Sequence, residues 1–132
     1  MSIIVEDGTL VVDAESYVDI AYADAYWSAR NNEDWADADD VVKEAALRIA
    51  TEYLETTYRW IGQRLQVKQS LCWPRYVPDG VDRDLRIIVN RSIPRAVRYA
   101  ECELALESVL NGKLDPTIDL QTKAEPDGPV SV

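Results

Sequence analysis

The chain has 132 residues, of which 47% are apolar and 29% charged, a composition typical of one soluble globular domain. It contains no histidine and only two cysteines, Cys72 and Cys102, which argues against a zinc site and excludes Ser-His and Cys-His catalytic pairs. No apolar run reaches the ~20 residues of a membrane span. Because no glycine-rich phosphate loop is present either, we expect no enzyme, no cofactor and no metal.

The net charge of −10 is distributed unevenly along the chain. Residues 1–58 carry 14 acidic and 3 basic side chains, whereas residues 59–100 carry 3 acidic and 9 basic ones, and residues 101–132 carry 7 acidic and 2 basic ones. The basic middle is almost all arginine, a residue suited to carboxylate and phosphate contacts. It could face a nucleic acid or the acidic part of a neighbouring copy, and the overall acidity favours the second.

The N-terminus is acidic and lacks the pattern of a signal peptide. Two short β-like runs, residues 3–5 and 10–12, flank the turn signal Asp7-Gly8 and predict a small hairpin or an extended arm. Ser16 is expected to cap a first helix that runs to about Arg30. Its predicted core face holds Val18, Tyr22, Ala25 and Ala29.

Ile20 and Trp27 fall on the opposite side of this predicted first helix, where a solvated helix would be polar. Two interpretations stay open for these side chains, which are partial burial under a loop and contact with another subunit. An acidic connection that contains Trp35 then leads to the next helix.

Residues 40–60 predict the central helix, because apolar side chains recur at helical spacing and no glycine or proline occurs before Gly62. Asp39 and Asp40 suit its N-terminus. The apolar face covers more than half of the circumference, so we expect this helix to pack between at least two others. The predicted stripe consists of Val42, Ala46, Ile49 and Tyr53, widened by Leu47, Ala50, Leu54 and Tyr58.

A long loop follows, because the Trp73-Pro74 step disfavours a central strand and Pro78 and Gly80 are turn residues. Within it, residues 85–89 could form a short strand or one arm of the loop. A third helix is predicted from the cap Ser92, with Pro94 in its first turn, to about Asn111. Gly112 is the expected C-terminal stop.

This third helix is apolar on two sides, which predicts burial on both sides, and Cys102 is expected in the core. The fold class is therefore all-α, or mainly α, with three long helices in a small bundle, a short N-terminal β-like arm, a long loop between helices 2 and 3, and an extended C-terminal tail. The corresponding division is a helical domain at residues 1–112 and an extended C-terminal tail at residues 113–132.

Several stretches together carry a resemblance to a known family. They are the opening residues 3–8, the segments 13–18 and 23–27, Trp35, the segment 43–47 with Tyr53-Leu54, the segment 69–75 with Trp73-Pro74-Arg75, and residues 93–97. In order and spacing, residues 1–112 are similar to the tailed-phage head–tail connector (adaptor) proteins, which are often labelled putative DnaT-like single-stranded-DNA-binding proteins.

The resemblance implies a structural virion protein that is made in the host cytoplasm and forms a ring, expected to be twelve-fold, below the portal. Such an adaptor extends the DNA channel and offers a docking platform. The implied partners are further copies of the chain, the portal protein, a stopper or tail-completion protein and passing double-stranded DNA without sequence-specific binding, with no membrane. The candidate subunit or portal contacts are Ile20, Trp27, Arg59, Arg64, Trp73, Arg75, Arg95, Arg98, Pro116, Ile118 and Leu120.

The alternative is a single-stranded-DNA-binding protein. It is supported by arginines interleaved with Trp60, Trp73 and Tyr76, since bases stack on aromatic rings and guanidinium groups bind phosphates. The net negative charge argues against it.

Overall fold

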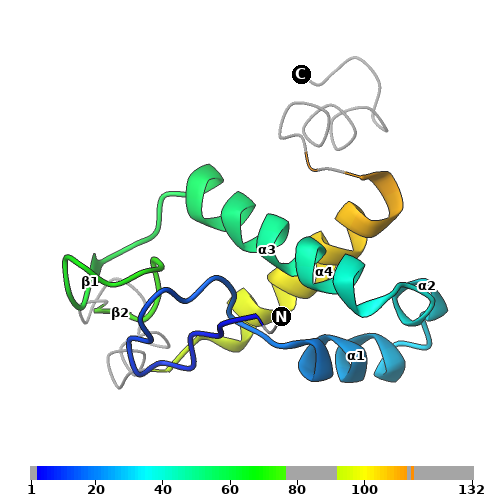
Figure 1. Cartoon of the computed structure of the whole chain (residues 1–132). Coiled ribbons are helices and arrows are strands. Elements are labelled where there is room, and N and C mark those ends of the chain that lie inside the picture. Colours follow the sequence, from blue (N-terminus) through cyan, green and yellow to red (C-terminus); the bar gives the residue numbers. More distant parts are fainter. Residues whose placement is uncertain (1–2, 77–91, 113, 115–132) are drawn as a thin grey trace, which may run out of the picture.

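The computed structural model describes residues 3–76, 92–112 and 114 of the chain. This part is mainly helical, as predicted, and Figure 1 shows how its elements are arranged. In chain order the elements are α1 (Ile20–Ala29), α2 (Glu33–Ala36), α3 (Asp40–Thr57), β1 (Gln63–Arg64), β2 (Arg75–Tyr76) and α4 (Arg95–Asn111).

The long helices α3 and α4 pack against each other and form the centre of the molecule (Figure 1). The predicted bundle of three long helices is not confirmed, because α1 has only ten residues and α2 only four. None of the helices in residues 3–76 and 92–114 is long and apolar enough to cross a membrane.

The central helix α3 lies close to its predicted bounds, but its buried face differs from the predicted stripe. Val42 is 44% exposed, and Ile49 and Tyr53 are only half-buried. The buried residues include two polar side chains that no hydrophobic pattern would select, and the full set is Lys43, Ala46, Leu47, Ala50, Thr51 and Leu54.

The third predicted helix corresponds to α4, and its C-terminal stop is confirmed. Gly112 adopts a left-handed conformation at φ 84°, and its N–H donates to the carbonyl oxygen of Ser108 at 2.7 Å. Cys102 is completely buried, as predicted. Glu101 is also completely buried, which is rare for a glutamate side chain.

The first helix starts later than predicted and buries a different face. Its N-cap is Asp19, whose carboxylate accepts a hydrogen bond from the N–H of Tyr22 at 2.8 Å. Ser16, the predicted cap, instead contacts Glu101. The buried side chains of α1 are Ala23, Tyr26 and Trp27, so the expectation of an outward-facing Trp27 is wrong.

The N-terminal segment is an extended arm rather than a hairpin. Among residues 3–19, the one bridge is parallel and joins Val5 to Ser16. The buried Glu6 carboxylate organises the arm, since it accepts hydrogen bonds from the backbone N–H groups of Gly8, Leu10 and Val11 at 2.8–2.9 Å. These bonds satisfy the charge of a completely buried side chain.

The segment after α3 folds back on itself through β1 and β2, which pair antiparallel with Gln63 opposite Tyr76 and Arg64 opposite Arg75. The stretch 85–89, for which a strand or a loop arm was predicted, lies outside the described residues. So does the predicted tail, apart from Leu114.

Candidate functional site

The end of the molecule beyond α3 carries a row of aromatic rings in mutual contact. The ring centroids of Tyr53 and Tyr58 are 6.2 Å apart, those of Tyr58 and Trp60 are 5.8 Å apart, and those of Trp60 and Trp73 are 5.6 Å apart. We refer to these four residues as the aromatic row. Its members come from the last turns of α3 and from the loop that follows, so the row spans the helix end.

The outer part of the aromatic row is accessible to solvent. Tyr58 is 47% exposed and Trp60 is partly exposed. Trp73 is only 4% exposed and packs against the ring of Trp60. Tyr76, at the end of β2, is a further aromatic side chain that is 47% exposed. Flat apolar rings are thus presented at the surface in a part of the chain that also carries positive charge.

A buried arginine fixes the backbone that carries this row. The guanidinium group of Arg75 donates to the carbonyl oxygens of Ile61 at 2.9 Å, Gly62 at 2.7 Å and Trp60 at 3.2 Å, and also contacts that of Cys72 at 3.3 Å. Its planar array of donors suits several carbonyl groups at once. Arg75 is only 8% exposed, so its role is to hold the loop together.

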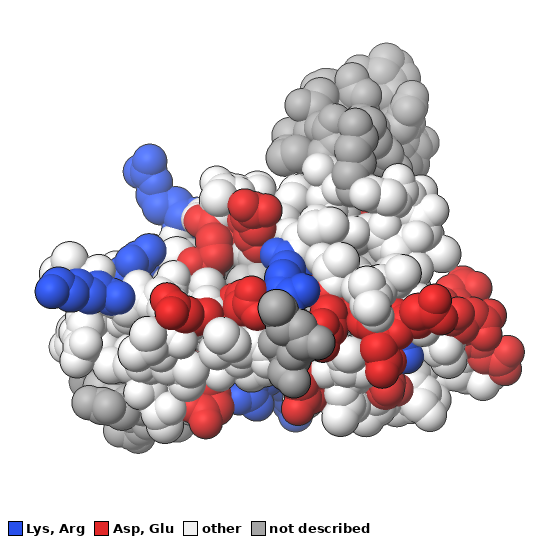
Figure 2. Space-filling view, viewed as in Figure 1, with Lys and Arg blue, Asp and Glu red and all other residues white. Residues whose placement is uncertain are grey.

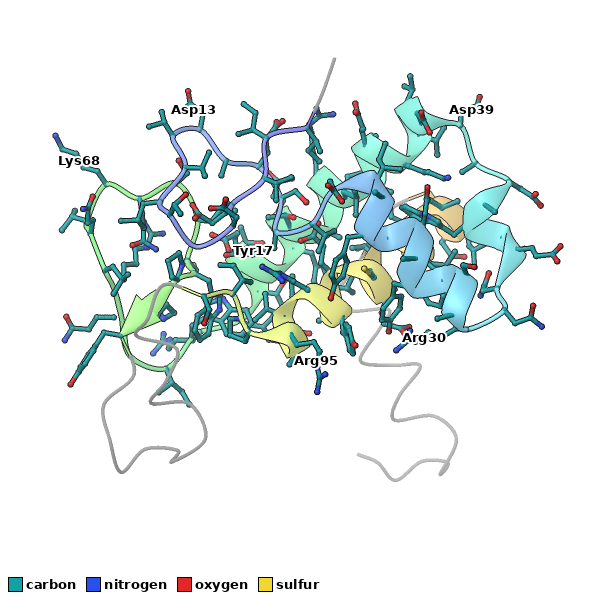
Figure 3. All side chains as sticks on the ribbon, turned by 90° about the horizontal axis from the view of Figure 1, so that it is seen from below. Asp13, Tyr17, Arg30, Asp39, Lys68 and Arg95 are labelled. Atoms are coloured by element: carbon teal, nitrogen blue, oxygen red, sulfur yellow. The ribbon has the colours of Figure 1, made fainter. Side chains whose placement is uncertain are left out.

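The segment 59–76 contains four basic residues and no acidic one, and we call it the acid-free segment. Three of its basic side chains, Arg59, Arg64 and Lys68, are exposed. Within the described residues none of the three forms an ion pair, and Arg64 makes only contacts to Gln69 and Cys72. Figure 2 shows lysine and arginine gathered at the end of the molecule that carries β1 and β2, and Figure 3 shows Lys68 pointing outward there.

The opposite end of the molecule, around α2 and the start of α3, is acidic (Figure 2). Residues 31–44 contain six acidic side chains and one basic one, Lys43. Lys43 is buried, and its ammonium group lies 3.0 Å from the carboxylate of Asp24. The same carboxylate accepts a hydrogen bond from the indole N–H of Trp35 at 2.8 Å. This ion pair explains how a lysine is tolerated on the buried face of α3.

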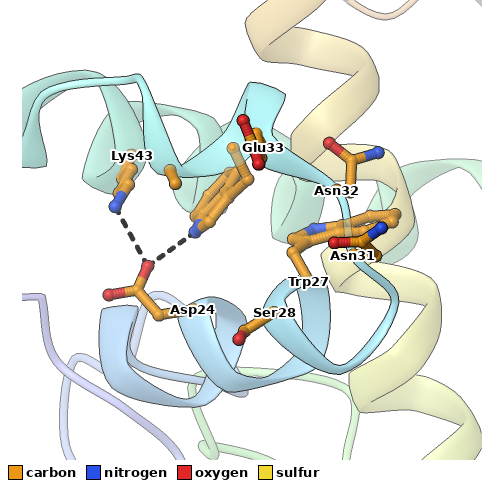
Figure 4. A pocket seen from close by; sticks show the side chains of 9 residues that line it. Asp24, Trp27, Ser28, Asn31, Asn32, Glu33 and Lys43 are labelled. Atoms are coloured by element: carbon orange, nitrogen blue, oxygen red, sulfur yellow. Dashed lines mark hydrogen bonds and ion pairs between the residues drawn. The ribbon is translucent and has the colours of Figure 1, made fainter.

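A pocket of about 360 Å³ lies beside this ion pair, between α1 and α2 (Figure 4). Its two tryptophans offer little surface, because Trp27 is 6% and Trp35 1% exposed. Polar side chains surround them, including Asn31, Asn32 and Glu33. With negative charge at its rim and hardly any open ring face, this pocket is poorly suited to a phosphate-bearing ligand.

The structure exposes only some of the predicted contact residues in the acid-free segment. Arg59 and Arg64 are exposed there, whereas Trp73 and Arg75 are buried. Arg95, at the start of α4, is exposed, with its guanidinium carbon 5.7 Å from the ring centroid of Tyr99.

The remaining predicted contacts lie elsewhere. Arg98 is half-buried, and its guanidinium carbon lies 5.8 Å from the ring centroid of Tyr22. Ile20 packs against the core, and the indole N–H of Trp27 donates to the carbonyl oxygen of Cys102 at 3.3 Å. Pro116, Ile118 and Leu120 lie outside the described residues.

Tyr58 is the member of the site that sequence reasoning misplaced, since it was assigned to the core stripe of the central helix. The helix ends at Thr57, and Tyr58 is already in an extended conformation with ψ 148°. The helical periodicity therefore no longer applies to it. No glycine or proline occurs between Asp40 and Gly62, so the sequence gives no signal that the helix ends at Thr57.

A family model described as "Putative DnaT-like ssDNA binding protein" matches residues 1–132, and the chain therefore belongs to this family. No curated protein and no solved structure matches the chain. The family match overturns the head–tail adaptor function expected from the resemblance and favours the alternative of single-stranded-DNA binding. The partners and the virion location implied by the resemblance stay predictions.

Proposed function

We propose that this member of the DnaT-like family binds single-stranded DNA through the acid-free segment and the exposed edge of the aromatic row. The observation that carries the proposal is that the accessible rings of Tyr58, Trp60 and Tyr76 occur together with exposed cations that form no ion pair within the part of the chain that the structure describes. These rings and cations belong to one segment or border on it, and that segment contains no acidic residue. Single-strand binding requires these two components, since bases stack on aromatic faces and cations follow the phosphates.

The arrangement favours a single strand over a duplex. In a duplex the faces of the bases are covered by their neighbours, so the rings of Tyr58 and Trp60 could contact only backbone or groove edges. An unpaired strand exposes the faces of its bases, and stacking on an aromatic side chain contributes about 1–3 kcal/mol per base. The side chains of Arg59, Arg64 and Lys68 are close enough in sequence to bind successive phosphates of the same strand.

The experiment is a fluorescence-anisotropy titration of a labelled 12-nucleotide single strand, with the matching duplex as competitor. We expect the single strand to bind more tightly, with an affinity that falls as salt rises because bound phosphates release counterions. Tyr58→Ala should weaken binding by about tenfold. Arg59→Gln should weaken it and lower the slope of log affinity against log salt by about one.

Arg30→Gln is the matched control, since it removes one positive charge at the far end of the molecule. Figure 3 shows Arg30 and Lys68 at opposite ends. If Arg30→Gln and Arg59→Gln weakened binding equally, the effect would come from net charge and not from this site. Absence of single-strand binding even at low salt would refute the proposed function.

A further inference from the structure

A groove of about 500 Å³ runs beside the aromatic row, between the C-terminal end of α3 and the first half of α4 (Figure 1 shows the two helices). Its lining is almost entirely apolar and consists of Leu54, Tyr58, Trp60, Ala96, Val97, Ala100, Glu103 and Leu104. The volume lies in the range of pockets that bind small organic groups. The groove is thus large enough for a flat ring and continuous with the proposed stacking surface.

The floor of the groove is rigid and its rim is aromatic. Leu54 and Val97, at 1% and 4% exposed, belong to the packed core and form the floor. Tyr58 and Trp60 form one wall, and the small side chains of Ala96 and Ala100 leave the space between that wall and α4 open. A planar ring that left the solvent here would bury apolar surface on several sides.

Glu103 is the charged side chain among the residues that line the groove. One carboxylate oxygen, Oε2, accepts a hydrogen bond from the hydroxyl of Tyr26 at 2.6 Å. Burial, together with this hydrogen bond to Glu103, raises the pKa of Tyr26 to about 12, so that Tyr26 remains a donor at neutral pH. Within the described residues the other oxygen, Oε1, has no hydrogen-bond partner.

The carboxylate of Glu103 is therefore an oriented hydrogen-bond acceptor beside an apolar slot. Arg59 lies between Tyr58 and Trp60 in the sequence, is exposed and is not paired within the described residues, so it can bind a phosphate that flanks a group in the groove. Apolar walls, an acceptor at the edge and an exposed cation between the two aromatic wall residues in the sequence together match a nucleobase that is still attached to its strand.

We propose that this groove takes up one base of the bound single strand, and that Glu103 accepts a hydrogen bond from the exocyclic amine of that base. The inference rests on the proposed function and deepens it by naming a specificity residue. Cytosine offers an amine at the position where thymine has a carbonyl oxygen, which a carboxylate would repel. The groove should therefore favour cytosine over thymine.

The test compares the affinities of the 12-nucleotide homopolymers of deoxycytidine and thymidine at pH 7.5, measured by anisotropy. We expect the wild-type protein to bind the cytosine strand about tenfold more tightly, the discrimination typical of a good side-chain pair with a base. Glu103→Gln should bring the ratio close to one, because an amide can turn either its donor or its acceptor toward the base.

Glu107→Gln is the control, since it makes the same change of charge one turn further along α4, outside the residues that line the groove. It should keep the wild-type ratio. Tyr26→Phe, which removes the bond that orients Glu103, should narrow the ratio without changing the net charge. The midpoints of thermal unfolding of all three variants show whether each of them folds.

Each outcome bears on one of the two proposals. Equal affinities of the wild-type protein for the two strands, or an unchanged ratio in Glu103→Gln, would overturn the base-selective groove and leave single-strand binding in place. If neither strand bound at any salt concentration, the proposed function itself would fail.

Discussion

Glu101 should make the stability of this protein depend on pH in the neutral range. Its carboxyl group is completely buried, and it lies 2.5 Å from the hydroxyl oxygen of Ser16 and 2.9 Å from the backbone nitrogen of Tyr17. The same Ser16 oxygen lies 2.7 Å from the carbonyl oxygen of Val18. Because a hydroxyl group has a single hydrogen, Ser16 can donate to both acceptors only in alternation, unless Glu101 itself carries a proton and donates to Ser16.

The pKa of Glu101 supports the protonated form. Burial raises it from 4.5 to about 7, against the opposing effect of the hydrogen bonds with Ser16 and Tyr17, and the nearby charge of Glu55 raises it further. The pKa is thus higher in the folded than in the unfolded chain, so the folded chain binds more protons between pH 4.5 and 7. Stability from this group is complete below pH 4.5 and is lost as the pH rises through 7.

The expected size of the effect follows from the shift in pKa. A rise from 4.5 to about 7 corresponds to about 3 kcal/mol of unfolding free energy between pH 4.5 and a pH well above 7. Asp7 and Glu15, whose pKa values are lowered by hydrogen bonds from Thr9 and Arg48, titrate below this window and change stability only at more acidic pH.

Urea unfolding followed by circular dichroism from pH 5 to 8.5 measures this dependence in the wild-type protein and in Glu101→Gln. Glutamine can donate to Ser16 and accept from Tyr17 without titrating, so the variant should keep most of the stability at pH 5 and lose the slope with pH. At pH 8.5 it should be the more stable protein. A wild-type stability that is flat or rises with pH, or parallel slopes in the two proteins, would refute the reasoning.

Two further predictions concern the loop after α3 and the C-terminal end of α4. Arg75→Lys keeps the charge but leaves several of the carbonyl groups of Trp60, Ile61 and Gly62 without a donor, so it should lower the unfolding free energy, measured in urea, by about 2–4 kcal/mol. A change smaller than the error of the measurement would contradict the role of Arg75 in holding the loop together. Gly112→Ala should lower the unfolding free energy by about 1 kcal/mol. The cost comes from the backbone angle φ of 84°, since no atom lies within 4 Å of an added Cβ atom. A variant that is more stable than the wild-type protein would contradict the left-handed C-cap of α4.

Hydrophobic spacing and local stop signals predicted the parts of the fold that depend on nearby residues. Asp39 is the N-cap residue of α3, although its side chain makes no capping hydrogen bond, and Gly112 ends α4 in the left-handed conformation that glycine favours. The mainly helical class follows from the same signals. The start of α1 was missed because Ser16 bonds to Glu101, a partner 85 residues away, which no local pattern reveals.

The buried polar residues explain most of the remaining errors. Lys43 and Thr51 occupy the inner face of α3, and Glu101 the inner face of α4, so the apolar residues alone do not define which face is buried. Lys43 has a partner from another element in Asp24, and Glu101 has partners in Ser16 and Tyr17. Within the described residues the hydroxyl group of Thr51 has no hydrogen-bond partner. A periodicity of apolar residues therefore placed the core stripe of α3 too far around the helix, and it could not show that Glu101 lies on the buried face of α4.

For the site, the sequence shows which basic and aromatic residues are present but not which of them are exposed to solvent. The arginines and aromatic residues of the segment 59–76 are visible in the sequence, whereas the division between the exposed Arg59 and the buried Arg75 depends on how the loop closes. The orientation of Glu103 by Tyr26 arises from the packing of α1 against α4, which the local sequence does not show.

The net charge of −10 is compatible with a nucleic-acid surface because the charges are separated in space as well as in sequence. At physiological salt, charges more than about 8 Å apart in solvent are largely screened from each other. The acidic side chains around α2 lie at one end and the cations of the acid-free segment at the other (Figure 2). A strand bound along the aromatic row would thus interact mainly with Arg59, Arg64 and Lys68, while the acidic end would repel strands that approach from its side. The net negative charge argued against DNA binding, but the spatial separation of the acidic and basic side chains confines binding to one end of the molecule.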